Sequence, residues 1–240
     1  MIELYHYVPV ANGGKVLMAL HEKEIPFRSH WIDLHAFEQH SPEYLEINPE
    51  GQVPALVHEG HVITQTSVIN EYLEDAFPHS PPLRPSAPLE AARMRQWNKY
   101  IDDVVMEAVS VHGWHTGAGQ IARGYSDEEF DILMARVPLE KQRIKWRQAR
   151  AGFAQEKLDD CTAKVAEAVA RVEQALEQGP WLLGEFFSFA DINFYAYCGG
   201  GLARMFPQIG SSATCPRVLE WVERMEARPG VAKALATSAP

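Results

Sequence analysis

The first part of the chain alternates between the apolar patterns of strands and those of helices. Residues 2–5 alternate apolar with polar, which predicts a strand, whereas Val16, Leu17 and Leu20 share one face of a helix predicted over 15–22. The other predicted elements here are a strand at 27–34, a hairpin with strands at 53–57 and 61–63, and a helix at 66–76. This order favours a mixed sheet with a right-handed first crossover.

Helical patterns dominate the rest of the chain. The stretch 78–88 reads PHSPPLRPSAP and is too rich in proline for regular structure, so it is predicted to link two domains. Beyond it, apolar residues keep helical spacing over 89–111, 141–176 and 218–227. Ser188 and Asp191 form a predicted capping box, with Asp in place of the usual Glu, which we interpret as a helix start. The sequence therefore predicts an α/β domain at 1–78, a linker at 79–88 and an all-α domain at 89–240.

Charge and cysteine content exclude several classes of function. Lys and Arg number 22 and Asp and Glu number 32, so the formal charge of −10 gives no electrostatic reason to bind nucleic acid or an anionic membrane. No apolar run reaches the length of a membrane span and the N-terminus has no signal pattern, so we expect a cytoplasmic protein. The scattered Cys161, Cys198 and Cys215 form neither a disulfide framework nor a zinc spacing.

The stretch from 48 to 73, NPEGQVPALVHEGHVITQTSVINEYL, is the most informative about function. Pro54 interrupts an apolar strand pattern, which a sheet tolerates only at an edge, a bulge or a cis bond. Such a bend leaves the backbone N–H and C=O of Val53 free to bind another extended peptide. Gln65 and Thr66 open the next helix, whose N-terminus favours a carboxylate. The combination predicts a receptor for a small acidic peptide and points to glutathione.

Several motifs resemble the glutathione transferase superfamily. They are Pro54 in QVPAL, the Gln65-Thr66 pair, Tyr72-Leu73 and the stretch from Ser188 to Asp191. The resemblance implies a thioredoxin-like N-terminal domain followed by an all-helical domain. Longer stretches are similar to the bacterial lignin-degrading β-etherases, which use glutathione to cleave β-aryl ethers: FEQHSPEYLEINPEGQVPAL, VITQTSVINEYLEDAFP, YSDEEF and PLEKQRIKWRQARAGFAQEKL. An insertion at about 115–146 is shared with that lineage.

The resemblance also implies a glutathione-binding set. Gln65 and Thr66 would hold the γ-glutamyl end, and Val53 would pair its backbone with the cysteinyl unit while Pro54 sets the bend. The residues implied at the glycyl carboxylate are His40, Gln39 and Gln52.

The activation of the thiol needs a hydrogen-bond donor to the sulfur anion. No hydroxyl or thiol lies between Val8 and Lys15, so Asn12 is the best candidate, assisted by backbone N–H groups at Gly13-Gly14. Alternatively, Asn12 is an ordinary helix N-cap residue.

The electrophile pocket is expected in the helical domain. Our candidates lie beside the insertion or the bend at 199, although aromatic residues at helical spacing often only fill a core. They are Trp114, His115, Tyr197 and Met205. His112 and His115 have a spacing that suits a metal, but no third ligand accompanies them, so we expect no metal.

The expected reaction is the attack of glutathione thiolate on the β-carbon of an α-keto β-aryl ether, which releases a phenol and leaves a glutathione thioether. The resemblance favours the branch of β-etherases that cleaves the S enantiomer, and it implies a homodimer. Two alternatives stay open: a general glutathione transferase, dehalogenase or disulfide reductase, and a non-catalytic glutathione-binding protein.

Overall fold

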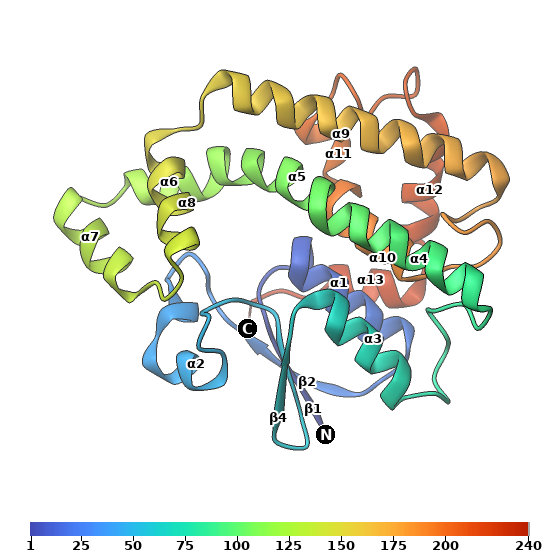
Figure 1. Cartoon of the computed structure of the whole chain (residues 1–240), viewed down its shortest axis with the longest axis horizontal. Coiled ribbons are helices and arrows are strands. Elements are labelled where there is room, and N and C mark those ends of the chain that lie inside the picture. Colours follow the sequence, from blue (N-terminus) through green and yellow to red (C-terminus); the bar gives the residue numbers. More distant parts are fainter. Residues whose placement is uncertain (240) are drawn as a thin grey trace.

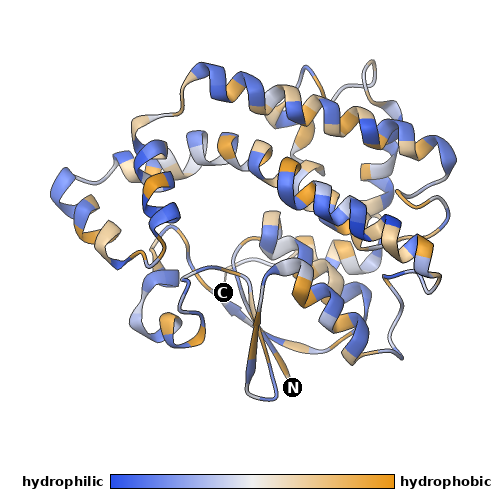
Figure 2. Cartoon of the chain, in the orientation of Figure 1, coloured by the Kyte–Doolittle hydropathy of each residue, from blue (hydrophilic) through white to orange (hydrophobic). Residues whose placement is uncertain are grey.

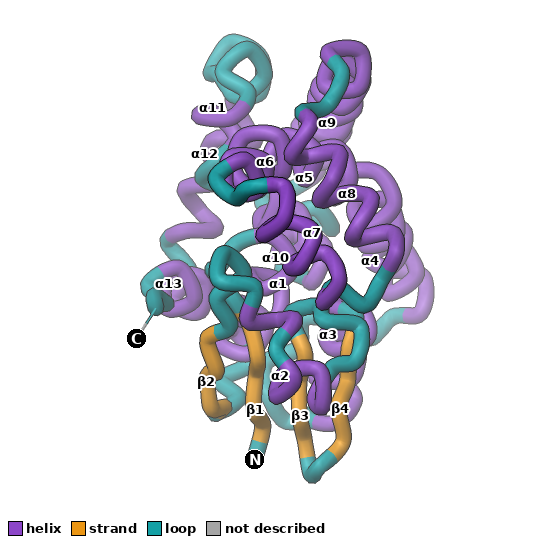
Figure 3. The backbone as a smooth tube through the Cα atoms, turned by 90° about the vertical axis from the view of Figure 1, so that its left-hand side faces the viewer, coloured by secondary structure: helices purple, strands orange, loops and turns teal. Residues whose placement is uncertain are grey.

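The N-terminal part folds around a four-stranded mixed sheet with the strand order β2-β1-β3-β4 (Figure 3). The computed structural model describes residues 1–239. The elements here are β1 (Ile2–His6), α1 (Ala11–Glu22), β2 (Phe27–Trp31), the short 3-10 turn η1 (Glu38–His40), α2 (Pro42–Ile47), β3 (Ala55–His58), β4 (His61–Thr64) and α3 (Thr66–Ala76). β1 pairs in parallel with β2 and antiparallel with β3, which pairs antiparallel with β4. The predicted mixed sheet and the helix at 66–76 are confirmed.

Helix α1 lies between the sheet and the helical part of the chain (Figure 1). Every side chain from Val16 to Leu20 is fully buried. A helix that is apolar all round needs cover on all sides; α3, α10 and α13 supply it, and the sheet residues Ile2, Leu4 and Leu56 belong to the same buried core. This burial fixes the start of α1, where Asn12 lies, relative to both parts of the molecule.

The helical part begins with a long helical rod that contains two π-helical turns. It consists of α4 (Pro88–Tyr100), the π-helical turn η2 (Ile101–Val105), α5 (Met106–Gly113), the π-helical turn η3 (Trp114–Ala118) and α6 (Gly119–Arg123). The helix predicted at 89–111 is therefore confirmed and extends further, because the π turns continue the helical backbone. π turns are frequent at functional sites, and both of these contribute residues to the cavity described below.

The remaining helices cover the rod and close the core. They are α7 (Asp127–Arg136), α8 (Glu140–Ala151), α9 (Gln155–Ala175), the 3-10 turn η4 (Leu176–Gln178), α10 (Phe189–Cys198), α11 (Leu202–Met205), α12 (Pro216–Glu226) and α13 (Pro229–Leu235). Figure 2 shows polar and apolar residues alternating along the long α9, as expected of an amphipathic helix with one buried face. No helix within residues 1–239 is long and apolar enough to cross a membrane.

The helical spacing predicted over 141–176 is confirmed, but it belongs to two helices, α8 and α9. α8 ends at Ala151, and Gly152 takes a φ of 90° before α9 begins at Gln155. Glycine adopts this backbone conformation without steric cost, so it ends the helix although apolar spacing continues on both sides.

The capping box at the start of α10 is confirmed. Ser188 and Asp191 bond each other's backbone N–H groups, and Asp191 also accepts from the backbone N–H of Leu182 and from Nε1 of Trp221. Asp191 is fully buried. Its role is to join the start of α10 to α12 and to the preceding loop, which agrees with our structural interpretation.

A second, smaller core holds the insertion in place. It is formed by Phe37, Ala122, Phe130, Met134, Val137 and Trp146. The ring centroids of Phe37 and Trp146 are 4.7 Å apart, and those of Trp114 and Trp146, which meet in a T-shaped arrangement, are 4.8 Å apart. This core connects α8 both to the loop before η1 and to the long rod, so α8 becomes a wall of the cleft between the two parts.

Candidate active site

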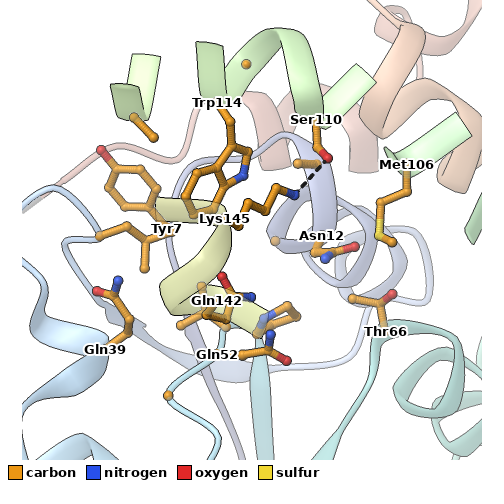
Figure 4. A pocket seen from close by; sticks show the side chains of 18 of the residues that line it. Tyr7, Asn12, Gln39, Gln52, Thr66, Met106, Ser110, Trp114, Gln142 and Lys145 are labelled. Carbon is orange, nitrogen blue, oxygen red and sulfur yellow. Dashed lines mark hydrogen bonds between the residues drawn. The ribbon is translucent and has the colours of Figure 1, made fainter. Parts of the chain in front are cut away.

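A cavity of about 770 Å³ lies where the N-terminal part, the long rod and α8 meet. Figure 4 shows side chains from all three entering it. The N-terminal part lines it with the loop after β1, with residues at 39–40 and 48–54 and with the start of α3, and the helical part lines it with η2, α5, η3, α8 and Tyr197. The cavity thus combines a polar end built on backbone with an aromatic end built on helices.

The peptide-binding edge has the geometry that the proline predicted. Of the three arrangements that tolerate Pro54 in a strand pattern, an edge, a bulge or a cis bond, the structure has a cis Val53–Pro54 bond. β3 begins only at Ala55, and within residues 1–239 the backbone N–H and C=O of Val53 make no backbone hydrogen bond. The Gln52 carbonyl accepts from Tyr44 Oη and from Asn48 Nδ2, both at 2.7 Å, which fixes the loop before the bend. An extended peptide can therefore pair with Val53.

Gln65 and Thr66 lie at the start of α3 and line the same end of the cavity. Gln65 takes a φ of 68°, a left-handed conformation that is uncommon for a residue with a side chain. No side chain caps the first N–H groups of α3. These groups and the helix dipole favour a bound carboxylate.

His40 and Gln39, which were predicted to contact the glycyl carboxylate, line the cavity but are almost fully buried. Within residues 1–239 neither His40 Nδ1 nor Gln39 Oε1 has a hydrogen-bond partner. Burial lowers the pKa of His40 to about 4, so the imidazole is neutral near pH 7. Gly51 packs against it: a Cβ at Gly51, where φ is 61°, would come within 2.5 Å of His40 Nδ1.

Asn12 occupies the first turn of α1 and faces the cavity. Tyr197 Oη donates a hydrogen bond to its Oδ1 at 2.5 Å, which leaves the Nδ2–H₂ group as the free donor. Burial raises the pKa of Tyr197, so its hydroxyl stays protonated and keeps donating. The alternative interpretation of Asn12 as a helix N-cap is wrong, because Val10 is the N-cap residue.

A buried ion pair beside Asn12 escaped sequence reasoning. Lys15 Nζ, which is fully buried, lies 2.6 Å from Asp102 Oδ1, while the hydroxyl of Ser67 donates to Asp102 Oδ2. Burial lowers the pKa of Lys15, and the Asp102 carboxylate opposes this shift. Asp102 comes from η2 and lines the cavity near Thr66. It escaped notice because 87 residues separate it from Lys15 in the sequence.

The structure brings two of the four electrophile candidates into the cavity. Trp114 and Tyr197 line it, together with Tyr7, Met106 and Ser110, which were not predicted to belong to this pocket. A spacing signal could have found Met106 and Ser110, because they lie eight and four residues before Trp114 on the same helical rod.

His115 and Met205 do not line the cavity, so they leave the candidate set. His115 Nδ1 accepts a hydrogen bond from the backbone N–H of Phe153 at 3.3 Å, which directs the imidazole toward the break between α8 and α9. Met205 ends the short α11 and is 37% exposed. Trp114, the residue before His115, lines the cavity, but a helical rotation of one position turns His115 away from it.

The insertion contributes a charged wall that sequence reasoning did not assign. Lys141, Gln142, Lys145 and Trp146 of α8 all line the cavity. Figure 4 shows Lys145 reaching toward Ser110. A run such as KQRIKWR is normally read as a solvent-exposed helix face, and only the fold shows that one side of it faces a cavity.

Comparisons with known proteins agree with this geometry. Family models for the N-terminal and C-terminal domains of glutathione S-transferase match residues 12–76 and 139–238. Protein LigF of Sphingobium sp. (strain NBRC 103272 / SYK-6) is 42% identical over 235 residues, which cover 96% of this chain and 91% of that protein. The crystal structure of beta-etherase LigF from Sphingobium sp. strain SYK-6 matches with a TM-score of 0.95 and 41% identity over 99% of both chains.

More distant relatives share the same fold. The probable glutathione S-transferase parC of Nicotiana tabacum is 28% identical over 241 residues, covering 97% of this chain and 88% of that protein. The structure of glutathione transferase F7 from Populus trichocarpa has a TM-score of 0.71 at 23% identity, covering 99% of this chain and 100% of that one. The thioredoxin-like sheet followed by a helical part is therefore the fold of this chain.

Proposed function

This chain belongs to the glutathione S-transferase family, and on that premise we propose that it is a glutathione-dependent β-etherase. Glutathione thiolate attacks the β-carbon of an α-keto β-aryl ether, a phenol leaves, and a glutathione thioether remains. One observation carries the proposal: a single cavity joins a peptide-binding edge, an amide donor and an aromatic chamber. The similarity to beta-etherase LigF, at a TM-score of 0.95, supports the choice of reaction.

Glutathione would lie along the polar end of the cavity. The N–H groups at Gln65 and Thr66 receive the γ-glutamyl carboxylate, and the nearby Asp102 carboxylate, which is 30% exposed, is available to the γ-glutamyl ammonium. The cysteinyl unit pairs with the backbone of Val53 beside Pro54. The glycyl carboxylate then reaches the remaining polar groups, His40, Gln39 and Gln52.

Asn12 is the proposed activator of the thiol. Its Nδ2–H₂ group donates to the sulfur anion, because Tyr197 already engages the amide oxygen. A donor to the charged form favours that form and lowers the pKa of the thiol. The loop after β1 thus compensates for its lack of a hydroxyl or thiol between Val8 and Lys15.

The aromatic ether would occupy the helical end of the cavity. Trp114, Tyr7 and Met106 offer the faces and the flexible thioether on which two phenyl rings can stack. A volume of about 770 Å³ falls within the range of sites that bury molecules of this size. The neighbouring ketone activates the β-carbon, so the enzyme mainly has to form the thiolate and align the reactants.

The test is the release of phenol from a racemic α-keto β-aryl ether, measured with and without glutathione. Attack from the side opposite the leaving group inverts the β-carbon, so a stereoselective enzyme should stop near half conversion. Binding of glutathione without release would contradict the proposal. Activity with chlorodinitrobenzene or a small disulfide would then favour a general transferase or reductase, and no turnover at all would favour a non-catalytic glutathione-binding protein. The homodimer and the cytoplasmic location stay predictions.

A further inference from the structure

Lys145 is placed inside the aromatic end of the cavity by the packing of its neighbour. Trp146, the next residue of α8, is anchored in the small core against Phe37 and Trp114. This anchoring turns the Lys145 side chain toward α5, where Nζ lies 3.2 Å from Ser110 Oγ and 4.9 Å from the centroid of the Trp114 ring (Figure 4). A long, flexible side chain is thereby held at one place in the cavity.

The Lys145 ammonium lacks a carboxylate partner. Among residues 1–239 its hydrogen-bond partner is the neutral Ser110 hydroxyl, which itself donates to the carbonyl of Glu107 at 3.2 Å. The Glu107 carboxylate, the charge that acts most on Lys145, is bound by Lys157 at 2.8 Å. An ammonium has three donors, so two remain for a ligand. Burial lowers the pKa of Lys145, and the Glu107 charge opposes this shift.

The proposed reaction develops negative charge at one place in this chamber. As the C–S bond forms, the β-carbon–oxygen bond breaks and its electron pair moves to the phenoxy oxygen. An aryl ring that stacks beside Trp114 carries that oxygen into reach of a donor located over the same ring system. A donor aimed at developing charge in a site with little water accelerates a reaction strongly.

We propose that Lys145 is a catalytic residue that donates a proton to the leaving phenoxy oxygen; this rests on the proposed function. The phenolate takes the proton from Nζ and leaves as a phenol, and the resulting neutral amine recovers a proton from water. The thiol proton lost to solvent when the thiolate forms balances this uptake. Phenols ionise with a pKa of about 10, so an ammonium whose pKa is lowered by burial is acidic enough for the transfer.

The test compares the wild type with Lys145→Met, which keeps an unbranched side chain of nearly the same length and removes the charge. A series of α-keto β-aryl ethers is used, with leaving groups from para-nitrophenol to unsubstituted phenol. We expect Lys145→Met to lower kcat about 100-fold for unsubstituted phenol and only a few-fold for para-nitrophenol, whose anion needs little stabilisation. KM for glutathione should not change, and Lys145→Arg, which keeps a donor, should retain part of the activity.

The matched control is Lys164→Met, the same substitution at an exposed residue of α9 that pairs with Asp160 and does not line the cavity. Melting curves of all variants show whether they fold. An equal loss for every leaving group would mean that Lys145 only supports the wall, and a raised KM for glutathione would mean that it binds the peptide; either result overturns the inference. A wild type that releases no phenol would instead overturn the proposed function itself.

Discussion

Asn12→Ala is the sharpest test of how the thiol is activated. The substitution removes the Nδ2–H₂ donor at the start of α1 and leaves the Tyr197 hydroxyl, now without its acceptor, in the wall. The glutathione-binding groups at Val53, Gln65 and Thr66 lie on other elements, so peptide affinity should change little. The change is therefore expected in the ionisation of the bound thiol.

The size of the effect follows from one charge-assisted hydrogen bond. Such a bond contributes about 1.5–3 kcal/mol, which corresponds to about 1–2 pKa units at about 1.36 kcal/mol per unit. A free thiol of pKa about 8.5 is about 3% thiolate at pH 7, whereas one lowered by 1–2 units is about 24–76% thiolate. Asn12→Ala should thus lower the bound thiolate at pH 7 by about 8- to 25-fold.

Turnover should fall less than the thiolate does. A more basic thiolate is more nucleophilic, with a Brønsted slope of about 0.4–0.5, so each remaining thiolate reacts about 3- to 8-fold faster and the net loss at pH 7 is about threefold. At high pH both enzymes carry thiolate and the variant should become the faster one, so the two pH–rate curves cross. The decisive assay is therefore a titration of the ultraviolet absorbance of bound thiolate, read together with kcat against pH.

A thiol pKa that stays unchanged in Asn12→Ala would refute this reasoning and transfer the role to the backbone N–H groups of α1. A loss of turnover that is equal at every pH would also refute it, because that result indicates alignment and not ionisation. Tyr197→Phe is the matched control: it frees the Asn12 amide from its partner but keeps the donor, so the thiol pKa should shift less than in Asn12→Ala.

Two further predictions concern buried charges. The folded-state pKa of His40 is lowered from 6.5 to about 4, so the unfolded chain binds more protons between these values and stability is lost as the pH falls through them. Urea unfolding should show that this group lowers the free energy of unfolding by about 2 kcal/mol between pH 7 and pH 5, and His40→Gln should abolish this contribution. A variant that loses as much stability between pH 7 and pH 5 as the wild type would contradict the burial argument. Asp102→Asn should destabilise the fold by about 3–5 kcal/mol, because it leaves the buried Lys15 ammonium without its counter-charge. Restoration of stability by Lys15→Met in the same chain would confirm the cause, and a double variant as unstable as Asp102→Asn would contradict it.

The sequence predicted the elements whose signals are local. The helix at 66–76 and the capping box of Ser188 and Asp191 appear where predicted, because an N-terminal signal and helical spacing lie within a few residues of each other. The bend at Pro54 was predicted for the same reason, since the loss of a donor is a property of proline itself. The break at Gly152 was missed because a single glycine is compatible with either a helix or its end.

The cavity residues that were missed depend on distant packing. Asp102 is opposite Lys15 only because α1 lies against the long rod, and Lys145 faces inward only because Trp146 packs on Phe37. His115 was misplaced by one helical position, for which the sequence carries no marker. When a site forms between two parts of a chain, the residues that line it are decided by how the two parts pack. Local sequence patterns carry little information about that packing.

The ion pair between Lys15 and Asp102 has a consequence for how the two parts can be exchanged among relatives. Lys15 belongs to the thioredoxin-like part and is completely buried, while its counter-charge comes from the helical part. A chimera that joins this N-terminal part to a helical part without a carboxylate at position 102 would carry an uncompensated buried cation. The two halves are therefore not interchangeable modules, and these two positions have to be transferred together.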